Sequence, residues 1–67
     1  MQYIKESRQA GGIPYKREEI TKAEAEAQIG AIRLRQLEEE AARQAPFFPG
    51  IAVMLETDAG AMVGVQS

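Results

Sequence analysis

Residues 20–50 have the sequence ITKAEAEAQIGAIRLRQLEEEAARQAPFFPG, and most of this stretch has the composition of a helix. Thr21 stands three residues before Glu24, which is the spacing of a capping box at a helix start. Pro46 cannot donate to the helical ladder and disfavours helix in the residue before it. The sequence therefore predicts one long helix over residues 22–45.

A narrow stripe of mostly small apolar residues predicts which side of this helix faces the core. Its members are Ala23, Ala27, Gly30, Leu34, Leu37, Ala41 and Ala45. The small side chains allow the helix to lie close against a sheet, and the leucines supply the large core side chains. Gly30 has two interpretations, which are a close approach of the helix backbone to the sheet or a kink.

Two isoleucines lie almost opposite this stripe. Ile29 and Ile32, with Gln36 beside them, fall on the side that a helix resting on a single sheet would expose to water. Two such side chains one turn apart indicate a second contact, with a partner protein or with another copy of the chain. The alternatives are that scattered surface isoleucines are ordinary, or that the N-terminal arm covers them.

Strand signals occur on both sides of the helix. Residues 2–8 are a predicted strand, and residues 9–20 are an irregular arm or, alternatively, contribute a second hairpin strand. Residues 51–57 and 61–66 are predicted strands joined by a three-residue turn that ends in Gly60. The whole chain is therefore predicted to be a single α+β domain, with one long helix packed on a small antiparallel sheet that includes the C-terminal hairpin.

One face of the hairpin is unexpectedly apolar. It carries Ala52, Met54, Met62 and Gly64, whereas a solvated antiparallel sheet has a polar outer face. Met54 and Met62 are therefore predicted to lie in a partner or dimer interface. Residues 63–66, at the end of the last predicted strand, are expected to expose an unpaired edge.

The aromatic pair after the helix has two interpretations. Phe47 and Phe48 follow Pro46, and at least one of them is expected to close the end of the core. The alternative is an exposed aromatic anchor for a partner.

Composition limits the classes of function. The chain has 67 residues with no cysteine and no histidine, so disulfides, zinc sites and the commonest catalytic bases and nucleophiles are missing. A domain this small has a marginal core and usually depends on a disulfide, a metal or a partner. We therefore predict a non-enzymatic, cytoplasmic protein that uses no cofactor, does not enter a membrane, and binds a larger protein or a second copy of itself.

Nucleic acid is the third and least favoured partner. The basic residues of the N-terminal segment that could gather into a patch are Lys5, Arg8, Lys16 and Arg17. Such a patch could contact a phosphate backbone. Three glutamates dilute it, and the formal net charge of the chain is −2, so we expect at most weak nucleic-acid binding.

The order of elements resembles that of very small phage-encoded anti-CRISPR proteins, especially a type I-F inhibitor with one helix on an antiparallel sheet. The residues that carry the resemblance are Tyr3, Ile4, Glu6, Phe47, Gly50, Glu56, Thr57 and Gly60. The resemblance implies a phage or mobile-element protein that binds a subunit of the host surveillance complex and blocks its access to DNA. The alternative is a self-assembling structural or regulatory phage protein that dimerises through Ile29 and Ile32 or through the hairpin edge.

Overall fold

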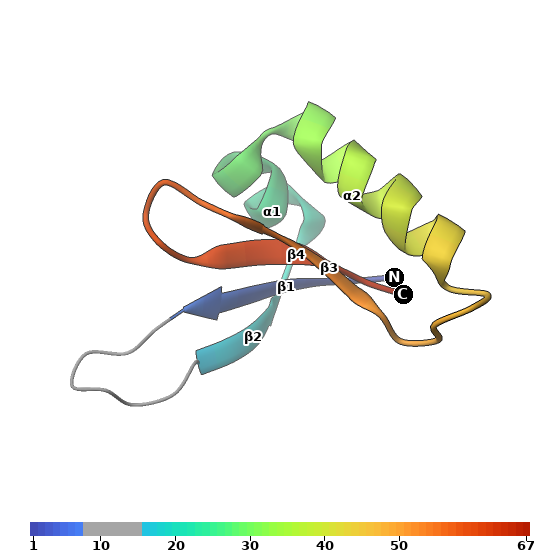
Figure 1. Cartoon of the computed structure of the whole chain (residues 1–67). Helices are drawn as coiled ribbons and strands as arrows, with labels where there is room; N and C mark the ends of the chain where they lie inside the picture. Colours follow the sequence, from blue (N-terminus) through green and yellow to red (C-terminus); the bar gives the residue numbers. More distant parts are fainter. Residues whose placement is uncertain (8–15) are drawn as a thin grey trace.

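The computed structural model describes residues 1–7 and 16–67, in which two helices pack on one face of a four-stranded antiparallel sheet (Figure 1). The strands are β1 (Gln2–Ser7), β2 (Lys16–Ile20), β3 (Ala52–Glu56) and β4 (Met62–Gln66). Their order across the sheet is β2-β1-β4-β3, so the first and last strands of the chain pair in its centre. This arrangement confirms the predicted α+β class, with two helices in place of one.

The predicted long helix is divided at Gly30 into α1 (Lys22–Ile29) and α2 (Ala31–Gln44). Gly30 has φ 87° and ψ 154°, a backbone conformation that interrupts a helix and that side-chain-bearing residues rarely adopt. The predicted cap is present, since Thr21 Oγ1 accepts a hydrogen bond of 3.1 Å from the Glu24 N–H. Of the two interpretations of Gly30, the structure shows the kink, which is visible in Figure 1.

The break changes which side of the first helix is buried. In α1 the buried residues are Ala25 and Ile29, whereas Ala23 and Ala27 of the predicted stripe are exposed. The prediction that Ile29 faces water is therefore wrong: its side chain is 8% exposed and belongs to the core. The physical reason is that a wheel drawn for one continuous helix loses its phase where Gly30 leaves the helical conformation.

The core lies between the helices and the middle of the sheet. Its buried members are Ala25, Ile29, Leu34, Ala41, Val63 and Val65. The second half of the predicted stripe is confirmed, because Leu34 and Ala41 of α2 are buried and Leu37 packs against them. Complete burial of a leucine such as Leu34 stabilises the fold by about 1.5–3 kcal/mol.

The arm after β1 contributes the second hairpin strand that was the alternative prediction. Residues 16–20 form β2, which pairs antiparallel with β1 from Tyr3↔Ile20 to Ser7↔Lys16. Arg8, the last residue of the predicted first strand, and residues 9–15 lie outside the described residues.

The prediction that Phe47 or Phe48 closes the end of the core is wrong. Phe47 and Phe48 are 77% and 60% exposed. Their backbone N–H groups both donate to the Gln44 carbonyl oxygen, and Gly50 takes φ 78°. This tight turn reverses the chain within a few residues, and it leaves both rings on the surface.

The C-terminal hairpin is confirmed, but its exposed edge is not the predicted one. Gly60 takes φ 80° in the three-residue turn, and the Thr57 N–H donates to the Ala61 carbonyl at 2.7 Å. Residues 63–66 lie between β1 and β3, so the edges of the sheet are β2 and β3. Neither helix in the described part of the chain has the length and apolar character that crossing a membrane requires.

Candidate functional site

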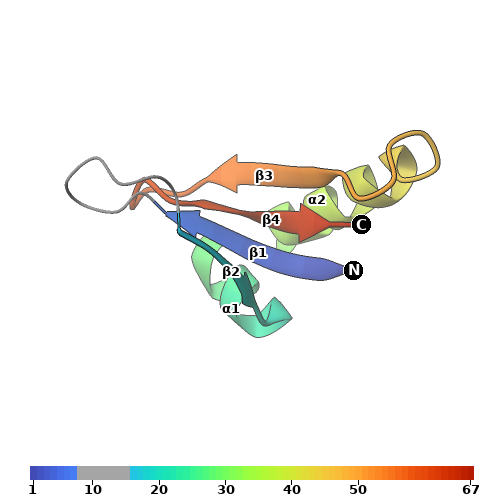
Figure 2. The ribbon, with the colours of Figure 1, turned by 90° about the horizontal axis from the view of Figure 1, so that it is seen from below.

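The face of the sheet that points away from the helices is the candidate site, and we call it the open face. Strand register arranges its side chains in three rows across the sheet. The rows are Arg17-Glu6-Met62-Glu56, Glu19-Ile4-Gly64-Met54 and Gln2-Gln66-Ala52. Figure 2, which looks at the sheet from this side, shows no helix or strand of the described residues in front of it.

The centre of the open face is apolar. Met54 and Met62 are partly buried, and Ile4 is only 3% exposed although it points away from the helices. Gly64 lies beside Met54 in the middle row. A Cβ atom on Gly64 would meet the Met54 Sδ at 2.7 Å and the Val53 carbonyl oxygen at 2.0 Å. The missing side chain of Gly64 therefore provides the space in which the Met54 thioether lies over the central strand.

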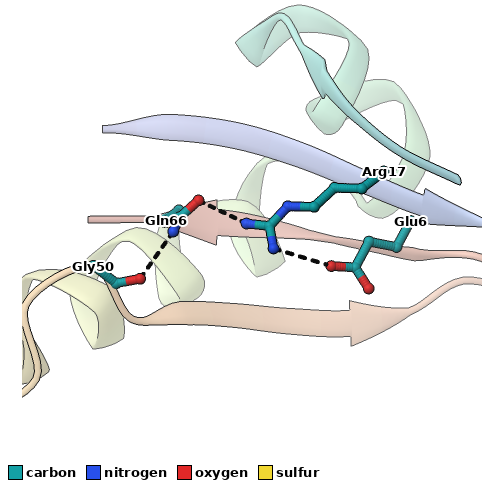
Figure 3. Close-up of polar contacts among 4 residues, drawn as sticks. All are labelled: Glu6, Arg17, Gly50 and Gln66. Atoms are coloured by element: carbon teal, nitrogen blue, oxygen red, sulfur yellow. Dashed lines mark hydrogen bonds and ion pairs between the residues drawn. The ribbon is translucent and has the colours of Figure 1, made fainter. Parts of the chain in front are cut away.

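A polar bridge joins β2, β1 and β4 on the open face, and we call it the Arg17 bridge (Figure 3). Arg17 Nη1 lies 3.6 Å from Glu6 Oε1, and Arg17 Nη2 donates a hydrogen bond of 2.7 Å to Gln66 Oε1. Gln66 Nε2 in turn donates to the Gly50 carbonyl oxygen at 2.9 Å. The bridge thus links both central strands to β2 and to the turn that precedes β3.

The Arg17 bridge crosses the part of β1 that carries Ile4. In the strand register Ile4 lies between the row of Glu6 and the row of Gln66, and the arginine side chain spans these two rows. Arginine commonly covers apolar surface with its aliphatic part while its charged end stays in water. The Arg17 and Glu6 side chains are 49% and 25% exposed, and such surface pairs contribute roughly 0–1 kcal/mol. The ion pair by itself therefore contributes little to the stability of the fold.

The structure separates the residues that were predicted to form one interface. Met54 and Met62 lie on the open face, whereas Ile32 and Gln36 are exposed on α2, on the other side of the sheet. Ile32 is 76% exposed, and Ile29 is in the core. The predicted set thus divides into two distant surfaces and one core residue.

The predicted basic patch does not gather on one face. Strand alternation places Lys5 and Lys16 on the helix side of the sheet and Arg17 on the open face. Arg17 is engaged with Glu6 and Gln66, and Arg8 lies outside the described residues. Within residues 1–7 and 16–67 there is also no cluster of three or more acidic side chains that could hold a metal ion. The described residues of the open face therefore offer a surface for contact.

One feature of the open face was absent from the sequence-based predictions, and one feature elsewhere on the surface was only an alternative. The hydrogen bond between Arg17 and Gln66 joins residues 49 positions apart, and neither residue type signals such a pairing. The exposure of Phe47 and Phe48 was only an alternative. Pro46 and Pro49, on either side of the aromatic pair, were the sequence signal for this exposure, because two prolines around a short segment favour a tight surface turn.

Comparison with known protein families, curated proteins and solved structures finds no match for this chain. The geometry and chemistry of the open face are therefore the basis on which its function is inferred.

Proposed function

We propose that this chain is a non-enzymatic interaction protein that acts by occupying a surface of a larger protein with its open face. The observation that supports this proposal is the apolar centre formed by Met54 and Met62, which no described element covers. Apolar surface that a small domain leaves uncovered on a sheet is typical of a binding site.

The chemistry of the open face fits a protein partner. Methionine side chains are flexible and polarisable, so they adapt to the shape of an opposing surface. Charged side chains surround the two methionines, as in interfaces with an apolar centre and a polar rim: Glu6, Arg17, Glu19 and Glu56. Three of these four charges are negative, so the complementary partner surface is basic.

The resemblance to anti-CRISPR proteins gives the proposal its specific form. In this form the chain is encoded by a phage or mobile element and acts in the host cytoplasm, where it binds a subunit of a type I surveillance complex. A surface that binds DNA is rich in lysine and arginine, which is the charge that the acidic rim of the open face complements. Binding there would exclude DNA without any catalytic step.

The test is target-DNA binding by a purified type I-F surveillance complex, measured by gel shift with increasing amounts of this protein. We expect the wild type to inhibit DNA binding and the Met62→Lys variant to inhibit at least about tenfold more weakly, as for a residue in the centre of an interface. In the strand register Met62 lies between Glu6 and Glu56, so a lysine there is electrostatically compatible with the fold.

Ile32→Lys is the matched control, because it introduces the same charge at an exposed position on the other side of the sheet. It is expected to inhibit as well as the wild type. Inhibition that is lost with Ile32→Lys and retained with Met62→Lys would reject the open face as the binding surface. Failure of the wild type to bind the complex would reject the anti-CRISPR form of the proposal.

A further inference from the structure

The two edges of the sheet differ in how they are protected against pairing with another strand. Four of the five residues in β2, KREEI, are charged, and charges on an edge strand oppose intermolecular pairing. The other edge, β3, has the sequence AVMLE with one charge and no proline or lysine. No strand of the described residues pairs with its outer side. β3 therefore lacks the usual protection of an exposed edge.

The hydrogen bonds of the hairpin show which backbone groups of β3 face outward. The Ser67 N–H donates to the Ile51 carbonyl at 3.1 Å, and the Thr57 N–H donates to the Ala61 carbonyl at 2.7 Å. Hydrogen-bonded and non-hydrogen-bonded pairs alternate along an antiparallel ladder. Residues 53 and 55 therefore pair with β4, whereas Ala52, Met54 and Glu56 direct their N–H and C=O groups away from the sheet.

We infer that β3 pairs antiparallel with β3 of a second copy of this chain, about a two-fold axis at Met54. In this register Met54 lies opposite Met54 of the second copy, and Ala52 lies opposite its Glu56. All three outward-facing residues of each copy then exchange both of their backbone hydrogen bonds. Each Glu56 faces an alanine rather than a like charge, so the pairing carries no direct repulsion between opposite residues.

This dimer is isologous, which means that the two copies use the same strand and the assembly closes at two subunits. It joins the two sheets into one and places the paired Met54 residues at the centre of a doubled open face. The turn between α2 and β3 lies beyond the start of β3 (Figure 2). The antiparallel pairing brings this turn, with Phe47 and Phe48, toward the hairpin turn of the second copy. The inference goes beyond the proposed function, since it requires no foreign partner.

The most direct test is cross-linking, because the chain contains no cysteine of its own. Directly opposite hydrogen-bonded residues have Cα atoms about 5.5 Å apart, within the range that a disulfide spans. Met54→Cys is therefore expected to form a disulfide-linked dimer under mild oxidation. Met62→Cys is the matched control, since it carries the same side chain on the same face but one strand further from the edge. We expect Met54→Cys to cross-link at least about tenfold faster.

Light scattering of the unmodified protein provides a second, independent measurement. At high concentration the wild type is expected to approach twice its monomer mass of 7.4 kDa. Met54→Lys is expected to remain monomeric, because it places two like charges opposite each other at the two-fold axis. Met62→Lys is expected to dimerise like the wild type. A wild type of monomer mass at every concentration would overturn the inference, as would equal cross-linking rates for the two cysteine variants.

The same variants separate this inference from the proposed function. Met62→Lys is expected to weaken binding to the surveillance complex while the dimer persists. A monomeric wild type that still inhibits DNA binding would overturn the dimer and leave the proposed function supported. A wild type that dimerises but does not bind the complex would overturn the anti-CRISPR form of the proposed function and leave the dimer supported.

Discussion

The Tyr3 hydroxyl on β1 donates a hydrogen bond to the Glu38 carboxylate on α2. Lys22 on α1 also contacts this carboxylate, with its Nζ 3.5 Å from Glu38 Oε2. One glutamate therefore connects the sheet to both helices at a site that is partly shielded from water. This polar contact complements the apolar core, because it limits how α1 and α2 can shift relative to β1.

Titration of Tyr3 tests this contact. The hydrogen bond to Glu38, with burial and the nearby negative charges, raises the pKa of Tyr3 to about 12. Since the folded pKa lies above the ordinary tyrosine value of 10.0, the contact contributes fully to stability below pH 10, and its contribution is lost as the pH rises through about 12. Tyrosinate absorbance of a Tyr15→Phe variant, in which Tyr3 is the remaining tyrosine, would measure this value.

Glu38→Gln is the control for the titration of Tyr3. It removes the negative charge and retains an acceptor, so the pKa of Tyr3 is expected to move back toward its ordinary value. An unchanged high pKa in Glu38→Gln would show that the glutamate charge is not the cause.

Substitution of Gly30 distinguishes the broken helix from a continuous one by the sign of its effect. In a continuous helix Gly30→Ala would stabilise the protein by about 1 kcal/mol. At φ 87° and ψ 154°, an alanine is strained, so we expect Gly30→Ala to destabilise the protein by about 1–3 kcal/mol. Urea denaturation monitored by circular dichroism measures the change, and Gln28→Ala, at an exposed position in α1, is expected to be nearly neutral.

Gly64→Ala tests the close packing of the hairpin under the open face. Its Cβ would lie 2.0 Å from the Val53 carbonyl oxygen, which belongs to the backbone of the paired strand and cannot rotate away. We expect a loss of stability of about 1–3 kcal/mol, as for other overpacked sites. Adding Met54→Ala removes only the Sδ contact, so the double variant is expected to stay destabilised. Recovery of full stability would mean that the side chain alone causes the clash.

Two substitutions of Arg17 separate the two roles of the Arg17 bridge. Arg17→Met keeps an aliphatic chain over Ile4 but removes the charge, and we expect it to change the free energy of unfolding by less than about 1 kcal/mol. Arg17→Ala also removes the aliphatic chain, so Ile4, which is 3% exposed, would gain exposure to water. We expect this variant to lower the free energy of unfolding by about 1–2 kcal/mol. Thermal or urea denaturation of both variants measures the difference. Equal losses would show that the ion pair, rather than the cover over Ile4, is what stabilises this face.

Much of the fold could be predicted because its signals are local. Thr21 caps the helix three residues before Glu24, and the helix ends before Pro46 as the missing proline N–H requires. Gly60 supplies the positive φ of the hairpin turn. Alternation along each strand also placed Met54 and Met62 on the face away from the core, because side chains of a strand alternate whatever lies around them.

The remaining features depend on contacts between distant parts of the chain. The sequence left open whether Gly30 continues or breaks the helix, and only packing against the sheet decides it, since the break turns Ile29 into the core. The edge strand is β3 rather than β4 because β1, at the other end of the chain, occupies the inner side of the hairpin. Local sequence determined where elements begin, turn and end. Tertiary structure decided which surfaces they bury and which they leave exposed, because burial depends on neighbours that are remote in sequence.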